Sequence, residues 1–280
     1  MSLNEQERRI LDSLLEWEKN YFDHLPTDIE RKYDQWLEEM FMVLPEDVQE
    51  KFWKQVDEWI IYLQIAIQQS KIQQERISHI VNEAKIFNQQ VATIEDLKKL
   101  PLDQLNYIVD QQISSHKLYS FLQGGISGSG HALFIGFDIP ALLAIQLRAI
   151  QLIAVTYGYN ITHPFELMVS LKLYHCATVP KRFQKQIWDQ LFYELENSEE
   201  SYFYDRQEKI TDLPWLNHVF VQLLKGLMIF LMCKRKNHGR SILSMGFGAW
   251  YNYSLTKKIT DLAKKFYQYR YLLEKEEKHF

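Results

Sequence analysis

Three side chains that could carry out chemistry, His131, Asp138 and Arg148, lie close together in a long apolar stretch. Between Leu118 and Phe165 the only charged residues are Asp138 and Arg148. A histidine can act as a general acid or base near neutral pH, and an arginine binds carboxylate or phosphate groups through its planar guanidinium. These residue types allow a hydrolase-type pocket. A helix-capping Asp138 and a snorkelling Arg148 would explain the same residues without any chemistry.

Other familiar catalytic and metal-binding patterns are absent from the sequence. The nine histidines form no HExxH pair or similar metal spacing, and Cys176 and Cys233 stand far apart. The segment GGISGSG, which begins at Gly124, lacks the lysine that ends a phosphate-binding loop. We therefore expect no metal and no cofactor, and enzyme activity remains an alternative rather than the first hypothesis.

Small residues recur at intervals of four in the apolar stretch. Half of the ten glycines lie in residues 124–136, and none precedes Gly124. On a helix, residues spaced by four form one ridge, and a ridge of very small side chains lets a second helix approach closely. We expect helix packing at Gly124, Gly128, Ala132 and Gly136, and again at Gly246 and Gly248.

The periodicity of apolar residues predicts an all-α fold. Residues 5–23 place Ile10, Leu14, Trp17 and Tyr21 at spacings of three and four, which is typical of a helix with one buried face. We expect a single domain over 1–280 with about nine helices: 5–23, 46–70, a continuation over 71–92, 102–122, 140–157, 164–176, 181–196, 214–233 and 241–274. At its centre we expect a buried, glycine-rich apolar hairpin formed by 118–136 and 140–157, with Asp138-Ile139-Pro140 at the corner.

No segment is a strong candidate for crossing a membrane. A spanning helix needs about twenty mostly apolar residues. Arg148 lies at the centre of 139–157 and Lys225 lies within 213–233, where a charge is costly. The start of the chain is polar and charged, so we expect no signal peptide and a cytoplasmic protein.

The two parts of the chain differ in charge. Residues 1–123 are rich in aromatic residues and hold 13 Lys and Arg against 22 Asp and Glu, whereas 124–280 hold 19 against 14. From Leu213 to Thr260 there is no acidic residue. Such a block favours an anionic partner. We expect a membrane surface or a transporter subunit rather than a nucleic acid, bound by Lys234, Arg235, Lys236, Arg240, Lys257 and Lys258.

The central residues resemble the signature of the EcsC family. The resemblance is carried by Gly124-Gly125, Gly128 and Ala132, by Asp138-Ile139-Pro140, by Leu147-Arg148, by Tyr157-Gly158-Tyr159-Asn160 and by Pro164 with Glu166. Family members usually have Asp where this chain has Asn160, which argues against an acid at that position. The resemblance adds Tyr157, Asn160 and Glu166 to the candidate cluster of His131, Asp138 and Arg148. It implies a bacterial helical protein, associated with an ABC transporter, and no particular reaction.

Three functional hypotheses follow. The first is a cytoplasmic protein that acts at the inner face of the membrane, as an accessory to an ABC exporter. The second is a hydrolase-type enzyme with a pocket near His131, Asp138 and Arg148. The third is a scaffold that binds another protein through its acidic, aromatic N-terminal helices. The first two differ in whether residues 118–157 are exposed as an apolar surface or enclose converging polar groups.

Overall fold

Every element in the described part of the computed structural model is a helix. The structure describes residues 3–23, 67, 70–127, 135–179, 181–197 and 242–277. They form seven α-helices and one 3₁₀ helix, which confirms the predicted all-α fold. The predicted helices 46–70 and 214–233 lie almost wholly outside the described residues. The elements are α1 (Glu5–Phe22), α4 (Lys71–Phe87), the 3₁₀ helix η1 (Glu95–Lys99), α5 (Leu102–Ser127), α6 (Ile135–Thr156), α7 (Pro164–Thr178), α8 (Lys181–Asn197) and α10 (Ile242–Glu277).

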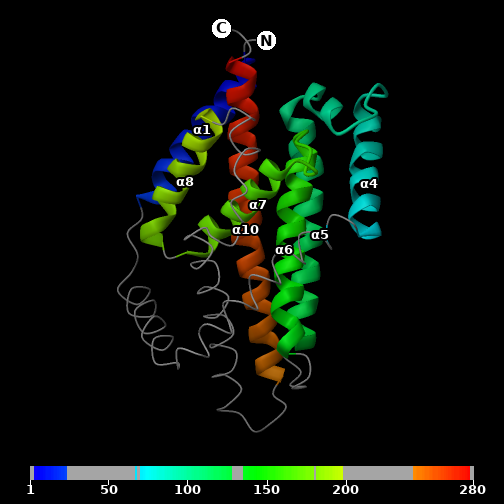
Figure 1. Ribbon diagram of the computed structural model, residues 1–280, viewed down its shortest axis with the longest axis vertical. Coiled ribbons are helices and arrows are strands. Elements are labelled where there is room, and N and C mark those ends of the chain that lie inside the picture. The colour runs from blue at the N-terminus through cyan, green and yellow to red at the C-terminus, as the bar shows by residue number, and fades with distance from the viewer. Residues whose placement is uncertain are drawn as a thin grey trace.

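The long helix α10 forms the centre of the bundle. It packs against α5, α6, α7 and α1, and Figure 1 shows α1 and α8 on one side of it and α6, α5 and α4 on the other. Helices α5 and α10 run antiparallel, because Ser120 bonds to Thr256 at 2.8 Å while Asp110 bonds to Lys264 at 2.6 Å. The C-terminal end of α5 and the N-terminal end of α10 therefore lie at the same end of the bundle.

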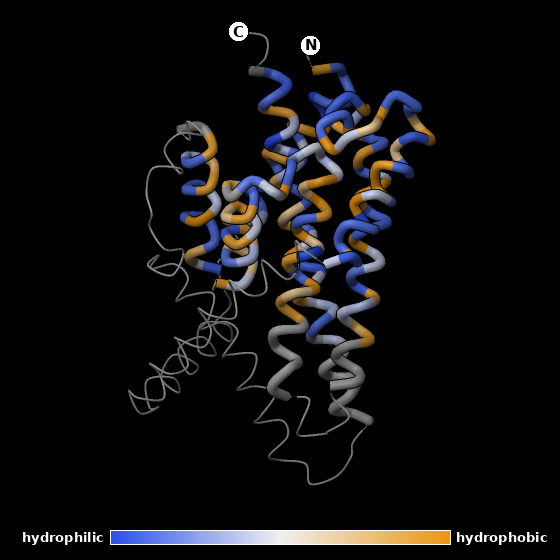
Figure 2. The backbone as a smooth tube through the Cα atoms, turned by 45° about the vertical axis from the view of Figure 1, so that its right-hand side comes forward, coloured by the Kyte–Doolittle hydropathy of each residue, from blue (hydrophilic) through white to orange (hydrophobic). Residues whose placement is uncertain are grey.

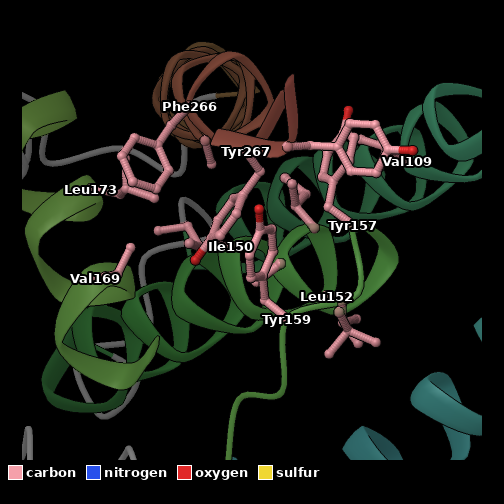
Figure 3. Packing of buried hydrophobic residues seen from close by; sticks show 14 of the residues in the cluster. Val109, Ile150, Leu152, Tyr157, Tyr159, Val169, Leu173, Phe266 and Tyr267 are labelled. Carbon is pink, nitrogen blue, oxygen red and sulfur yellow. The ribbon is translucent and has the colours of Figure 1, made fainter. Parts of the chain in front are cut away.

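The core is continuous across these helices. Figure 3 shows Ile150 of α6 and Leu173 of α7 facing Phe266 and Tyr267 of α10. A second group of rings joins α1, α8 and α10: Trp17 meets Trp188 at 5.8 Å between ring centroids, and Trp188 meets Phe266 at the same distance. In Figure 2 hydrophilic and hydrophobic residues alternate along the outer helices, as expected for helices with one buried face.

Local capping explains where two helices begin. Asn4 accepts a hydrogen bond from the backbone N–H of Glu7, and the Glu7 carboxylate accepts one from Asn4, which is the capping box that starts α1. Ser70 has an extended backbone, with ψ of 132°, and caps α4. The expectation that 71–92 continues the preceding helix is therefore wrong, because Ser70 starts a new one.

Helix α6 begins five residues before Pro140, where the sequence predicted its start. It starts at Ile135, so Asp138-Ile139-Pro140 lies inside the helix. The expectations of a corner at these residues and of a helix that starts at Pro140 are wrong. Proline is favoured at the first helical position but is also compatible with the first turns. Here the apolar residues before Pro140 extend the helix by more than one turn.

The described side chains of the two arms of the predicted apolar hairpin differ: most of those in α6 are buried, whereas residues 118–122 of α5 include four exposed ones beside the buried Ser120. In α6, Leu147, Ile150 and Ile153 have no exposed surface. In α5, Leu118 is 56% exposed and Leu122 is 53% exposed. Side chains 123–141 lie outside the described residues. Within the described ranges, none of the helices combines the length and the apolarity that crossing a bilayer requires.

Candidate functional site

The Tyr157-Gly158-Tyr159 triplet forms the C-terminal cap of α6. Gly158 donates to the carbonyl of Val155 at 2.8 Å, and Tyr159 donates to the carbonyl of Ala154 at 3.1 Å. This is the Schellman arrangement, which needs a left-handed residue after the helix. Gly158 supplies it with a φ of 84°, and a Cβ there would lie 2.4 Å from Cγ of Lys98. The glycine therefore turns the chain sharply and keeps both tyrosines against the core.

The two tyrosines of the triplet are anchored to α5 and α10. The Tyr157 hydroxyl donates to Oδ1 of Asn106 at 2.7 Å, an oxygen that also accepts a hydrogen bond from Gln268. The Tyr157 ring stacks on Tyr267, and Tyr159 meets the same ring at 5.3 Å between centroids. Figure 3 shows Tyr157, Tyr159 and Tyr267 side by side. Burial raises the pKa of all three hydroxyls well above the usual value, so they are neutral near pH 7.

Glu166 belongs to a partly buried ionic network that we call the Arg270 network: Glu166, Arg270, Glu274, Lys98 and Tyr159. Arg270 donates to Glu166 at 2.7 Å and to Glu274 at 3.0 Å. Lys98 donates to the other carboxylate oxygen of Glu274 at 2.7 Å. The centre of the Tyr159 ring lies close to both cations, 3.9 Å from the Arg270 guanidinium carbon and 4.1 Å from the Lys98 nitrogen.

Two charges of this network, those of Arg270 and Glu274, are held in the ionised form by their neighbours. Burial opposes the charge of Arg270, but Glu166, Tyr159, Tyr267 and Glu274 together outweigh it, and the pKa of the guanidinium is raised. Burial likewise opposes the charge of Glu274, yet Lys98 and Arg270 keep the pKa of its carboxyl below the usual range. Both carboxylates are thus fully engaged with cations. The network is suited to fixing the turn at residues 157–163 against α10 and η1, and not to proton transfer.

Asn160 has a local structural role at the same turn. Its side-chain oxygen accepts from the backbone and hydroxyl of Thr162, and its nitrogen donates to Glu95 at 3.1 Å. An amide performs both tasks at once, whereas an aspartate could not donate to Glu95. The structure therefore brings Tyr157, Asn160 and Glu166 together around one end of α6.

Arg148 lies elsewhere, where α6 meets the start of α4. It donates to the Ser70 hydroxyl at 3.3 Å and precedes Tyr157 by nine residues, roughly 13 Å along α6. His131 lies outside the described residues, and of Asp138 only the helical backbone is described. The convergence of His131, Asp138 and Arg148 therefore stays a prediction. In the described ranges, no three side chains of the metal-ligating types gather.

The small residues that we expected on one ridge are distributed over separate helices. Gly124 lies in the last turn of α5 and Gly136 in the first turn of α6, while Gly128 and Ala132 lie outside the described residues. Gly246 and Gly248 lie in the first turns of α10. The four-residue spacing therefore does not run along a single helix.

One end of the bundle exposes large apolar side chains. We call it the apolar tip, and its described residues are Leu118, Tyr119, Phe121 and Leu122 of α5 with Trp250 and Tyr253 of α10. Trp250 is 60% exposed. Figure 1 shows the adjoining ends of α5, α6 and α10 grouped together. Spacings of three and four put Leu118, Phe121 and Leu122 on one face of α5, and Trp250 and Tyr253 on one face of α10.

Basic residues surround this tip. Lys257 is exposed and follows Tyr253 by one helical turn, next to Lys258. From Ile242 to Thr260, α10 carries these two charges and no acidic residue. Lys117 lies one residue before Leu118 and pairs with Asp261 at 3.7 Å. The expected anion-binding residues Lys234, Arg235, Lys236 and Arg240 lie outside the described residues and precede α10 directly in the sequence.

Sequence reasoning missed most partners in the Arg270 network. Arg270, Glu274 and Lys98 were not singled out, because nothing local marks them as partners of Glu166. The only signal was the four-residue spacing of Arg270 and Glu274, which predicts a pair on one helix face. It does not reveal the third partner, Lys98, far away in the sequence.

These features define a helical bundle with an ionic network beside three packed tyrosines, and with an exposed apolar tip. The chain belongs to the EcsC protein family, whose family model matches residues 8–272. It is similar to the uncharacterized protein YdbA of Bacillus subtilis (strain 168), with 24% identity over 183 residues. That match covers 65% of this chain and 64% of the relative. No solved structure matches the chain.

Proposed function

We propose that the protein acts at the inner face of the cell membrane as a peripheral protein, and that the apolar tip is its contact with anionic lipid. The observation that carries this proposal is the exposure of six large apolar side chains at one end of the bundle, beside a stretch of α10, Ile242 to Thr260, whose only charges are Lys257 and Lys258. Monomeric proteins rarely expose such a group without a partner. Tryptophan and tyrosine side chains favour the interface between lipid and water.

The spacing of the residues along α10 fits an interfacial depth. From Trp250 to Lys257 the helix rises roughly 10 Å. Interfacial segments bury their apolar faces about 5–10 Å deep, at the boundary of headgroups and acyl chains. With Trp250 at that boundary, Lys257 would lie at the level of the headgroups. Each basic residue near an anionic surface contributes about 1 kcal/mol.

Two observations favour this reading over a scaffold role of the N-terminal helices. In α1, Trp17 and Tyr21 stack on each other, and Trp17 also packs against Trp188 of α8. These aromatic side chains are used within the fold. Glu18 of α1 is bonded to Lys185 at 2.7 Å, so part of the acidic character is also neutralised internally.

Vesicle flotation tests the membrane proposal. We expect the protein to float with vesicles of phosphatidylcholine and phosphatidylglycerol, and much less with phosphatidylcholine alone. Replacing two partly exposed side chains, as in the double variant Leu122→Ser with Trp250→Ser, removes about 1 kcal/mol each of apolar transfer. Binding to anionic vesicles should weaken about thirtyfold.

A matched control lies at the far end of the molecule. Ile86, at the C-terminal end of α4, is 80% exposed, so Ile86→Ser changes a similar amount of exposed apolar surface away from the tip. This variant should bind like the unchanged protein. Equal binding of the control and the double variant would refute the assignment of the tip, and absence of binding to both vesicle types would refute the lipid contact.

An accessory role beside an ABC exporter is the more specific form of the proposal. It is supported by the family resemblance and not by any contact in the described residues. It predicts tighter binding to vesicles that contain a reconstituted bacterial ABC exporter than to protein-free vesicles of the same lipids. Equal binding to both kinds of vesicle would refute the contact with the exporter, and the proposed contact with lipid would still hold.

A further inference from the structure

Arg148 is a partly buried guanidinium with few hydrogen-bond acceptors around it. Its one described hydrogen bond goes to the Ser70 hydroxyl at 3.3 Å, and its Nε is buried without a partner. Burial lowers the pKa of this guanidinium, and the charge of Arg76 lowers it further. A guanidinium has five N–H donors, and burying such a charge is costly unless an acceptor compensates it. In the described part of the chain, no carboxylate pairs with Arg148.

A second arginine approaches the same place from α4. Arg76 donates to the Tyr119 hydroxyl at 2.6 Å, and its guanidinium carbon lies 5.8 Å from the centre of that ring. Among the described residues it too has no ion pair. The charge of Arg76 acts on Arg148, and neither arginine pairs with a carboxylate among the described residues. The two cations therefore create a region of positive potential between α4, α5 and α6.

One further group near Arg148 suits a negatively charged ligand. The N-terminus of α4, which begins after Ser70, carries a partial positive charge, and the N–H groups of Lys71 and Ile72 lack intrahelical acceptors, whereas that of Gln73 donates to the Ser70 cap. His116 of α5, 3% exposed, lies next to Tyr119 with its ring perpendicular to the tyrosine ring. Its Nδ1 donates to the carbonyl of Gln112 at 2.8 Å, so the neutral ring is not a ligand for an anion, but it lies where it can report a change in the local charge.

We propose that Arg148, Arg76 and the first turn of α4 form a binding site for a phosphate group, supplied either by a lipid headgroup or by a free phosphorylated compound. The planar guanidinium forms paired hydrogen bonds with phosphate oxygens, and helix N-termini bind the same groups. A phosphate would satisfy the donors of Arg148 and screen the repulsion between the two arginines. The site stands on residues other than those of the apolar tip, so it holds for free phosphate even if the protein contacts no membrane.

The position of the site links it to the tip in one respect. Tyr119, the partner of Arg76, lies between Leu118 and Phe121, which belong to the tip. A protein that rests on a bilayer with this end down would bring the two arginines to the level of the lipid phosphates. A lipid headgroup is therefore one possible source of the bound phosphate, and the experiments must distinguish it from a free phosphorylated compound.

The first experiment titrates inorganic phosphate into the full-length protein at constant ionic strength. Binding is followed by calorimetry and by the imidazole resonances of His116. This histidine faces Arg76 of α4, Arg148 of α6 and Tyr119 of its own helix, α5. A bound phosphate should raise the pKa of His116, because it neutralises the two arginines that lower it. Chloride at the same ionic strength should not change it.

Variants identify the site. Arg148→Gln should weaken phosphate binding at least tenfold, and Arg148→Lys should weaken it less, because it keeps the charge and loses the planar fork. The control Arg9→Gln removes an exposed arginine of α1 and should leave binding unchanged. If Arg148→Gln does not fold, Arg76→Gln makes the same test. The proposal is overturned if phosphate leaves the pKa of His116 unchanged, or if Arg148→Gln and Arg76→Gln bind phosphate as tightly as the unchanged protein.

The second experiment separates the two sources of phosphate. Vesicles that contain phosphatidic acid, a phosphate monoester, are compared with phosphatidylserine vesicles of equal surface charge. A preference for phosphatidic acid that Arg148→Gln abolishes supports the headgroup. Equal binding to both, together with binding of free phosphate that depends on Arg148, supports a soluble ligand. Failure of all vesicle binding with phosphate binding intact refutes the proposed membrane role and leaves this site standing.

Discussion

His116 gives the sharpest test of the electrostatics of this fold. Burial, and then the charges of Arg76 and Arg148, lower the pKa of its imidazole from 6.5 to about 4. The folded protein therefore keeps His116 neutral at pH values where the unfolded chain binds a proton. Since the unfolded state binds more protons below pH 6.5, the free energy of unfolding must decrease as the pH falls from 6.5 towards 4.

The size of this effect follows from the two pKa values. The loss amounts to about 2 kcal/mol at pH 5 and about 3 kcal/mol at pH 4, relative to pH 7. Urea unfolding at pH 7, 6 and 5, in buffers without phosphate, measures it. The variant His116→Gln removes the titrating group. The unchanged protein should lose about 2 kcal/mol more than this variant between pH 7 and pH 5, whatever the variant loses in stability at pH 7.

An exposed histidine supplies the control. The His79 side chain is 65% exposed on α4, so a change in pH dependence that His116→Gln causes and His79→Gln does not cause belongs to the buried imidazole. If the unchanged protein and His116→Gln lose the same stability between pH 7 and pH 5, the imidazole is not held neutral in the folded state. The reasoning from burial and neighbouring arginines would then be wrong.

Three further predictions concern the network, the turn and the buried thiol. Glu166→Gln leaves Arg270 with one carboxylate instead of two and should cost about 3 kcal/mol in urea unfolding, because it breaks a buried ion pair. Gly158→Ala should cost about 2 kcal/mol by the same measurement, because alanine is strained at a φ of 84° and its Cβ would collide with Lys98. Cys176 is 1% exposed and burial raises its pKa to about 12, so in a Cys233→Ser background it should react with Ellman's reagent only upon unfolding.

Each of these three predictions can be contradicted by a specific result, and the first has a control variant. Asp110→Asn breaks an ion pair whose aspartate is 60% exposed, and should cost less than about 1 kcal/mol. A cost for Glu166→Gln no larger than that would mean that the Arg270 network adds little to stability. Unchanged stability of Gly158→Ala would show that the turn can relax. Rapid labelling of Cys176 in the native protein would contradict its burial.

Several elements of the fold could be predicted from local patterns alone. The periodic apolar residues of α1, and the segments that became α7, α8 and the long α10, were expected within a few residues of their observed bounds. A helix with one apolar stripe can be identified in the sequence, because its stripe reflects the period of the helix itself. The charge asymmetry and the EcsC signature were also evident from the residues alone, and the family match over 8–272 confirms the latter.

The start of α6 shows where a local rule fails. Proline favours the first helical position, and this preference suggested a helix that begins at Pro140. The helix begins at Ile135 because proline is also tolerated in the first turns. Because α6 begins at Ile135, Asp138 lies inside the helix and is not its capping residue. For the same reason Gly136 belongs to α6, whereas Gly124 belongs to α5.

The sequence by itself determined which part of the chain is basic and predicted most of the described helices, apart from where α4 and α6 begin. Only the tertiary structure decided which faces are covered and which charges meet. Glu166 meets Arg270 across a gap of 104 residues, and Arg148 reaches Ser70 across 78. Leu122 is exposed while Ile150 is buried, although both lie in apolar stretches. The physical reason is that a helical period depends on neighbouring residues, whereas burial and ion pairing depend on what the rest of the chain places against each helix.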